Sequence, residues 1–367
     1  MTRIGSRGLP AAEPGDLSSA KWSWACRHLR SGGFSEAYRL QKDASNPRPG
    51  DVALVRVEKL GHHRHLETMP ERRLRLYHGD HLIGVFGNRY ATGAYEGQAL
   101  GLEDLHLLSG SGIIGTVISR HRSIGSPTAL SFLGYLADSA ARRVNLVDLR
   151  CRPCSSSPAS APVIAVIGTG MNTGKTTVTR KILRALVSAG LEVAGCKLTG
   201  TASPRDLHEM QSTGALFTTD FSEYGFPSTS GLPLEELLQL FTYMLTGCGL
   251  SEPQVVIMEI ADGFLQPETQ ALLRSGEFRN QIRGVIVAGA CSGSALCATD
   301  YIRRAGFDVW AVSGLITNSP LFMREFAENS PIPMVSSRSG GDWANLIMRR
   351  LGAPKSEEYR WETKASC

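Results

Sequence analysis

The strongest hydrophobic pattern in the chain is a short apolar run followed by a helical repeat. Residues 163–167 read VIAVI, a continuous stretch typical of a strand buried on both faces. Residues 176–189 then repeat apolar side chains every three or four positions, as an amphipathic helix does. Such segments continue to alternate downstream. The further predicted strands are 192–197, 255–260, 284–288 and 309–316, and the further helices begin near 204 and 267 or cover 234–246 and 295–305. This alternation predicts an α/β domain with a parallel sheet, in which residues 217–230 form a long loop.

A different period governs the first part of the chain. Apolar and polar residues alternate with period two over 51–60, 72–78, 81–90 and 113–119, which predicts short strands. A glycine-rich region covers 91–115. Together these segments predict a small β-rich domain, either a barrel or a sandwich.

The remaining segments complete a predicted division of the chain. Residues 17–42 are expected to form one or two short helices, with Trp22 and Trp24 docking them on the body of the protein. We predict a flexible N-terminus with short helices over 1–49, a β-rich domain over 50–150, a Pro/Ser linker over 151–162, an α/β domain over 163–352 and a tail over 353–367.

Composition and charge narrow the class of protein. With 42% hydrophobic and 20% charged residues, the chain is ordinary for a globular protein. It has no apolar run of about 18 residues and no secretion signal, so we expect a cytoplasmic protein that does not bind membranes. Residues 1–150 hold 20 Lys/Arg against 14 Asp/Glu, whereas the remainder holds 19 against 20. This small excess would suit an anionic substrate, although solvated surface charge is the favoured explanation, and no basic stripe predicts nucleic-acid binding.

Cysteines and histidines form two short clusters. Eight cysteines without an export signal are expected to be free thiols. Cys151 and Cys154 form a CxxC in the linker, and residues 62–65 read HHRH in a predicted loop. Neither cluster has a complete set of metal ligands nearby in sequence, so an incidental pair and a solvated loop are favoured over metal binding.

The residues between the apolar run and the first helix read GTGMNTGKTT. Their glycines let amide groups point at a phosphate, and the helix adds the positive end of its dipole. In such a loop Lys175 contacts the β and γ phosphates and Thr176 offers a hydroxyl to Mg²⁺. The glycine spacing is one residue off the usual G-x4-G-K-[ST], but the flanking strand and helix fit. The loop residues predicted to bind a nucleotide are Gly168, Thr169, Gly170, Met171, Asn172, Thr173, Gly174, Lys175, Thr176 and Thr177.

Acidic residues near other strand ends extend this site. Glu259 lies near the end of the apolar strand VVIMEI, and the carboxyl edge of an open α/β sheet is where ligands bind. We therefore predict that Glu259 holds Mg²⁺ together with Thr176 and Asp206. Asp262 is a further candidate. Helix capping is the alternative role for Asp206, and a turn role is the alternative for Asp262.

The predicted catalytic residues are two lysines. Lys197 closes the strand 192–197, so its ammonium should reach the same edge as Lys175 and share the stabilisation of phosphoryl charge. Catalysis of this kind needs no protein nucleophile, in keeping with the absence of an evident Ser-His-Asp or Cys-His set. Candidate substrate contacts are Asp220, Ser228, Thr229 and Ser230 in the long loop and the clusters 87–90 (GNRY) and 120–122 (RHR), with exposed loop positions as the alternative.

The order of these features resembles the dethiobiotin synthetase branch of P-loop enzymes, in the SIMIBI class that also contains cobyrinic acid amide synthetases. The resemblance covers residues 162–340 and implies a P-loop NTPase domain with ATP and Mg²⁺. It assigns the metal to Asp206 and Glu259, and the adenine contact to Asn318 of the run TNSP. The family has an aspartate where Gly170 stands, and its residues for a diamine substrate have no match here. Nucleotide handling therefore transfers, whereas the substrate does not.

These observations predict an ATP- and Mg²⁺-dependent enzyme of the ligase or synthetase type, which activates a small carboxylate or carbamate by phosphoryl transfer. The rival hypothesis is a nucleotide-dependent accessory or metal-delivery NTPase, for which the HHRH and CRPC clusters would be the ligands. The sequence does not decide whether the nucleotide is ATP or GTP, because it has no N/T-K-x-D run for recognition of the base. It does not set the oligomeric state either, and a homodimer is our expectation.

Overall fold

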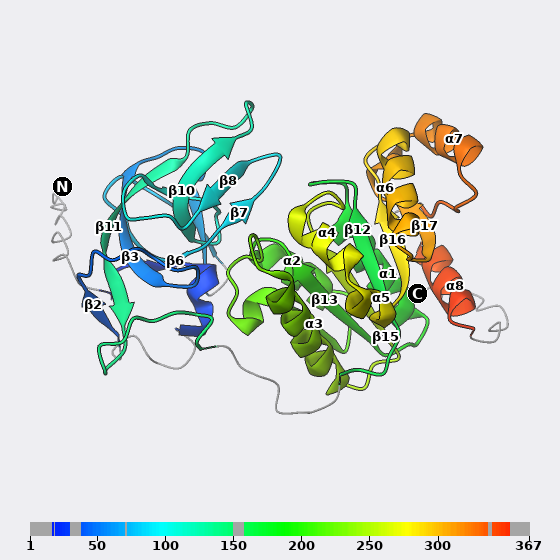
Figure 1. The fold of residues 1–367 in the computed structure, drawn as a ribbon, viewed down its shortest axis with the longest axis horizontal. Coiled ribbons are helices and arrows are strands. Elements are labelled where there is room, and N and C mark those ends of the chain that lie inside the picture. The colour runs from blue at the N-terminus through cyan, green and yellow to red at the C-terminus, as the bar shows by residue number, and fades with distance from the viewer. Residues whose placement is uncertain are drawn as a thin grey trace, which may run out of the picture.

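A computed structural model describes residues 17, 19–29, 38–69, 72–149, 158–336 and 340–352. The chain forms a β-rich part followed by an α/β part, which lie side by side (Figure 1). The predicted fold class is confirmed: an N-terminal β-rich sheet precedes an α/β domain with a parallel sheet. Cys151 and Cys154, and the predicted tail, lie outside the described residues.

The β-rich part is built on one sheet that closes on itself. Its strands run in the order β1-β6-β3-β11-β9-β10-β8-β7, and β10 also pairs with β6, so five of them, from β6 through β3, β11 and β9 to β10, form a closed ring. The strands are β1 (Lys21–Trp22), β2 (Arg39–Gln41), β3 (Val52–Lys59), β6 (His81–Phe86), β7 (Arg89–Tyr90), β8 (Tyr95–Gln98), β9 (Leu105–Leu107), β10 (Ile113–Arg120) and β11 (Thr128–Ala137). A separate hairpin consists of β4 (His65–Thr68) and β5 (Arg72–Arg75).

Strand β3 of this sheet is buried on both faces along most of its length, as the alternation of its side chains explains. On β3, Val52 and Leu54 join one apolar cluster, whereas Ala53, Val55 and Val57 join another on the opposite face. Successive side chains of a strand point to opposite faces, so a strand with apolar residues at consecutive positions can supply two cores.

Two predictions for this part need correction. The described residues of the segment 17–42 form two strands, β1 and β2, besides one six-residue 3-10 helix, η1 (Trp24–Leu29). The HHRH cluster is not entirely in a loop, since His65 begins β4. The glycine-rich stretch 91–115 contains β8 and β9. The strands β1 and β2 form by pairing with the distant strands β6 and β11, whereas β4 pairs with the neighbouring β5.

The α/β part is organised on a six-stranded sheet in which every pairing is parallel. The order is β14-β13-β15-β12-β16-β17, so the strand before the phosphate loop is central. The strands are β12 (Val163–Gly168), β13 (Val193–Thr199), β14 (Phe217–Asp220), β15 (Val255–Ile260), β16 (Ile282–Ala288) and β17 (Val309–Ser313). Their carboxyl ends therefore meet at one edge of the sheet.

Helices cover both faces of this sheet (Figure 1). The apolar cluster on one face includes side chains of α1, α2 and α8, and the cluster on the other face includes side chains of α3, α4, α5 and α6. The helices are α1 (Lys175–Ser188), α2 (Pro204–Gln211), α3 (Leu234–Gly249), α4 (Pro267–Arg274), α5 (Gly276–Gln281), α6 (Ser292–Arg304), α7 (Pro320–Asn329) and α8 (Gly340–Arg350), with short 3-10 helices η3 (Phe221–Tyr224) and η4 (Leu315–Asn318).

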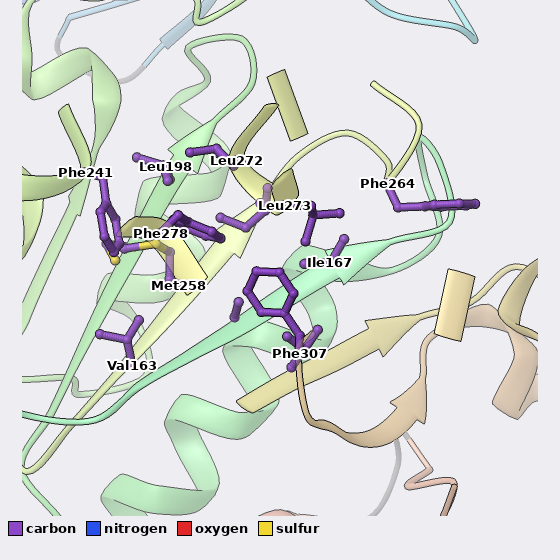
Figure 2. Close-up of a cluster of buried hydrophobic side chains, with 14 of the residues drawn as sticks. Val163, Ile167, Leu198, Phe241, Met258, Phe264, Leu272, Leu273, Phe278 and Phe307 are labelled. Carbon is purple, nitrogen blue, oxygen red and sulfur yellow. The ribbon is translucent and has the colours of Figure 1, made fainter. Parts of the chain in front are cut away.

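The two apolar clusters together explain why β12, the central strand, has a continuous apolar sequence. Figure 2 shows Val163 and Ile167 of β12 beside Met258 of β15, under aromatic side chains such as Phe278 and Phe307. Val166 and Ile164 face the opposite cluster, so all of β12 is buried. Burial on both faces fixes the position of the strand that leads into the loop.

Two predicted boundaries in this part differ from the structure. Residues 217–230 are not wholly a loop, because β14 and η3 occupy their first half. The strand predicted over 309–316 ends at Ser313, where Gly314 with φ +90° turns the chain into η4. Among the described residues, none of the helices combines the length and the apolar character needed to cross a bilayer.

Side chains of the two parts contact each other directly. Arg27 of η1 donates to Glu223 Oε1 at 2.6 Å and to Ser222 Oγ at 2.9 Å, and both acceptors belong to η3. Asn88 Nδ2 donates to the carbonyl of Ser230 at 3.2 Å. The Arg27 side chain is buried, whereas Glu223 is partly exposed, so this ion pair links the two parts at the edge of their contact.

Candidate functional site

The loop between β12 and α1 has the backbone conformation that a phosphate cradle requires. Gly174 and Asn172 adopt positive φ angles of +96° and +59°. A side chain at Gly168 would lie 2.7 Å from Cδ and 2.8 Å from Nζ of Lys175, so only glycine leaves room for that lysine. The loop leads directly into a 14-residue helix, whose amino end suits an anion.

Lys175 is buried within this loop and is held by carbonyl groups. Its Nζ donates to Gly170 O at 2.8 Å and to the carbonyl oxygen of Asp262. Burial lowers the pKa of Lys175, and the carboxylates of Asp262 and Glu259 oppose that shift. Among the described residues, none places a carboxylate within ion-pair distance of this ammonium. Its charge is thus available to an anion in the loop.

Thr176 and Glu259 form the second element of the site. Thr176 Oγ1 donates to Glu259 Oε1 at 3.1 Å. Glu259 is 1% exposed, and its other oxygen, Oε2, is buried without a hydrogen-bond partner among the described residues. Burial raises the pKa of Glu259, while Lys197 acts in the opposite direction. A buried carboxylate oxygen that lacks a donor, next to a hydroxyl, fits Mg²⁺, which prefers oxygen ligands.

Lys197 and Asp206 form the third element. Lys197 lies opposite Glu259 in the register of β13 and β15, and its ammonium pairs with Asp206 Oδ2 at the start of α2. Burial by itself would lower the pKa of Lys197, but the charges of Asp206 and Glu259 outweigh it and raise that pKa. Lys197 therefore stays protonated. Asp206 also lies in the first turn of α2, where its negative charge suits the helix dipole. The N-cap residue of this helix, Ser203, makes no side-chain capping hydrogen bond.

These elements line one cavity of about 420 Å³. Loop residues 171–177 form one side, and the strand-end residues Lys197, Glu259 and Asp262 and the helix residue Asp206 form another. Arg89 and Ala91 of the β-rich part also line it. The cavity thus brings together both predicted catalytic lysines and all three predicted metal ligands. Gly168, Thr169 and Gly170 shape the loop without lining the cavity, and Thr169 Oγ1 accepts from the amide of Ala290 at 3.1 Å.

Several other predicted residues lie elsewhere. Asn318 is exposed on η4 and does not line this cavity, although the neighbouring Leu315 does and donates its amide to Thr173 O at 3.1 Å. Asp220 is buried and accepts from the amide of Ser222 at 2.8 Å, so its carboxylate caps η3, and it lines neither cavity described here. Thr229 Oγ1 accepts from the amide of Gly200 at 2.9 Å.

A second cavity of about 320 Å³ lies between the two parts of the chain. Ser228 and Ser230 line it, together with Gly87 and Asn88. The predicted substrate loop therefore faces a different cavity from the phosphate loop. The cluster 120–122 is exposed and lines neither cavity.

The histidine cluster is an aromatic contact in this structure. The rings of His62 and His63 lie 4.9 Å apart and pack on Tyr95, at 5.9 and 5.7 Å. Over the described ranges, no group of three or more His, Cys, Asp or Glu side chains is arranged to hold a metal. The cysteines that the structure describes are all free thiols, as predicted.

Sequence reasoning missed some residues that line the main cavity. Thr201, Arg205, Glu209 and Leu315 were not singled out. Arg205 and Glu209 share α2 with Asp206, so one helical turn around the predicted acid would have found them. Leu315 had no signal in sequence, since it reaches the cavity only through the turn at Gly314.

Comparison with known proteins adds the following. No protein-family model matches the chain, and no curated protein matches it. Structural matches include the signal recognition particle 54 kDa protein of Aeropyrum pernix K1 in complex with GDP, with a TM-score of 0.33 and 17% identity over 56% of this chain. The receptor FtsY of Elizabethkingia anophelis matches with a TM-score of 0.32 and 14% identity, over 55% of this chain and 69% of that one. FtsY of Mycoplasma mycoides matches with a TM-score of 0.35 and 11% identity, over 55% of this chain and 70% of that one. The match spans half the length of the 54 kDa protein, and likenesses this distant concern the fold alone.

Proposed function

We propose that this chain is an ATP- and Mg²⁺-dependent enzyme that activates a small carboxylate or carbamate by phosphoryl transfer. The single observation that carries the proposal is the Thr176–Glu259 contact, with its unpartnered buried carboxylate oxygen, in the same cavity as Lys175 and Lys197. A buried acid costs free energy unless a cation or donor satisfies it. A metal ion bound to a polyphosphate would do so.

Each residue of the cavity has a role in this scheme. The inward amides of the loop and Lys175 bind the β and γ phosphates, and Thr176, Glu259 and Asp206 would hold the metal. Mg²⁺, when bound, neutralises the charge that develops on the phosphate oxygens. Lys197, kept protonated by its acidic neighbours, lies on the side of the acids and stabilises the transferring group.

The chemical step needs no protein nucleophile. An oxygen of the substrate carboxylate forms a bond to the γ phosphorus, and the bond between that phosphorus and the β–γ bridging oxygen breaks, leaving its electron pair on ADP. The residues act by holding the two reactants in line and by excluding water. A nucleophile then displaces phosphate from the activated carboxyl group.

The resemblance to dethiobiotin synthetases supports this choice of chemistry over simple hydrolysis. It rests on the loop, Lys197, Asp206 and Glu259, all of which lie around one cavity. Asn318 gives no support, because it is exposed away from that cavity. The choice of ATP over GTP is part of the proposal and is tested with both nucleotides. A homodimer stays a prediction, to be tested by light scattering.

The test is a pair of measurements on the full chain. Calorimetry with Mg²⁺ should detect binding of ATP, more weakly of GTP, and release of ADP should depend on a small carboxylate chosen from a panel that includes bicarbonate. No binding of either nucleotide would contradict the proposal. Hydrolysis that no carboxylate accelerates, together with stoichiometric metal in the purified protein, would favour the accessory NTPase.

A further inference from the structure

Arg89 enters the phosphate-loop cavity from the other part of the chain. It lies on β7, which pairs with β8 through the register Arg89↔Gly97. The turn between these strands lies against the phosphate loop, because a side-chain carbon at Gly93 would be 3.5 Å from Met171 Sδ. The β-rich part thus forms a wall of the cavity, and Arg89 is the cationic residue on it.

The guanidinium is fixed but incompletely satisfied. Its Nη1 donates to the carbonyl of Leu108 and lies 3.2 Å from His63 Nε2. Its Nε is buried and has no hydrogen-bond partner among the residues that the structure describes. Nor does any described carboxylate lie within 4.0 Å of it. Two contacts of Nη1 therefore hold the guanidinium, while the Nε–H donor remains unused.

The electrostatics of this arrangement favour an incoming anion. Burial lowers the pKa of Arg89, and the charge of Asp262 only partly compensates. Burial and the neighbouring Arg89 lower the pKa of His63 to about 3, so its ring is neutral at physiological pH and Nε2 can accept from the guanidinium. A desolvated guanidinium without a carboxylate partner is costly, and an oxyanion at its free edge removes that cost.

We propose that Arg89 binds the carboxylate of the acceptor substrate, so that the β-rich part supplies the substrate-binding wall of the phosphate-loop cavity. This inference rests on the proposed function and names its substrate subsite. The polyphosphate already has the loop amides, Lys175 and the amino end of α1, all from the α/β part. Arg89 faces the same cavity from the opposite part, where the second reactant must lie. His63 is a positioning residue that orients the guanidinium.

The experiment uses the full chain with Arg89→Gln and Arg89→Lys, and with Arg122→Gln, in the turn after β10, as a matched control in the same part of the chain. Arg122 is exposed and lines neither cavity. The probes are oxalate, malonate and succinate, titrated calorimetrically into protein saturated with MgADP. We expect Arg89→Gln to lower the affinity for the tightest-binding probe by roughly 10- to 100-fold, as for the loss of a charged hydrogen bond. The affinity for MgADP should be unchanged. Arg89→Lys should recover part of the affinity, and Arg122→Gln should match the wild type.

The contrary outcomes are equally specific. The proposal is overturned if none of the three probes binds the wild type, or if Arg89→Gln binds them equally well. It is also overturned if Arg89→Gln weakens a non-hydrolysable ATP analogue but not ADP, since the oxyanion would then be the γ phosphate. If the wild type binds no nucleotide, the proposed function fails on its own. The probes are then titrated into nucleotide-free Lys175→Ala protein, with and without Arg89→Gln, which tests Arg89 separately.

His63 is tested by rescue. Glutamine can accept a hydrogen bond from the guanidinium, whereas leucine fills similar space without an acceptor. His63→Gln should therefore keep the probe affinity within about twofold, and His63→Leu should weaken it several-fold at unchanged MgADP affinity. Equal affinities in the two variants would show that His63 does not orient Arg89.

Discussion

Thr176 and Glu259 meet at the carboxyl edge of the sheet: the threonine hydroxyl donates to one carboxylate oxygen at 3.1 Å, and the other oxygen is buried without a partner among the described residues. A group in that position is stabilised when a cation arrives. The relationship therefore predicts how the protein responds to Mg²⁺.

Glu259→Gln should abolish stabilisation by Mg²⁺ in the presence of nucleotide while leaving the unliganded protein within about 1 kcal/mol of the wild type, because the charge removed is one that burial disfavours. Thermal unfolding with and without Mg²⁺ measures both effects. Glu277→Gln, at an exposed position of α5, is the control. A variant that Mg²⁺ stabilises as fully as the wild type would exclude Glu259 as a ligand.

Lys175→Ala should lower the affinity for MgATP by roughly 10- to 100-fold and abolish turnover, since it removes a charged hydrogen-bond donor from the loop. Circular dichroism should show an intact fold. Lys181→Ala, on the same helix but outside the cavity, serves as the control and should bind MgATP normally. Unchanged affinity in the Lys175 variant would remove the proposed function.

Asp206→Asn should destabilise the protein by about 2 kcal/mol, because it leaves the buried ammonium of Lys197 without its ion-pair partner. Urea unfolding measures the change. Asp300→Asn removes an exposed i,i+4 pair with Arg304 and should cost at most about 0.5 kcal/mol. Adding Lys197→Met to Asp206→Asn should recover stability, and the absence of recovery would contradict the buried-pair explanation.

The neutral state of His63 predicts a loss of stability in acid. The unfolded histidine takes up a proton below pH 6.5, whereas the folded one, with its pKa lowered to about 3 by burial and by Arg89, does not. Unfolding is therefore favoured as pH falls from 6.5 towards 3, by about 1 to 2 kcal/mol at pH 5. Comparing urea unfolding of the wild type and His63→Gln at pH 7 and pH 5 isolates this contribution, with the exposed His121→Gln as the control. Parallel losses in all three proteins would refute it.

Local signals were sufficient for the parallel sheet of the α/β part and for the strand and helix that flank the loop, although two boundaries of the α/β part differ. The run from Val163 to Ile167 is buried on both faces, and that is what a continuous apolar strand requires. Glu259 and Lys197 could be placed at one edge because parallel strands share their direction. These predictions needed only the period of the pattern and the topology rule.

The β-rich part was less predictable because its strands depend on distant partners. β9 has three residues and acquires its structure by pairing with β10 and β11. The structure places Ser228 and Ser230 at the second cavity for a similar reason, since Asn88 of the other part of the chain donates to the carbonyl of Ser230 there. Arg89 was one of several exposed-loop candidates in sequence, and only the docking of the turn at Gly93 on Met171 distinguishes it from Arg120.

The cavity walls come from positions as far apart as Arg89 and Leu315. During translation Arg89 emerges early, and the strands of the β-rich ring, which end by Ala137, are all present before the opposite wall has been made. Contacts between residues so distant in sequence form late. A chain that stops before Leu315 would therefore lack part of the wall that faces Arg89, and the ability to bind both reactants together would report that synthesis has passed that residue.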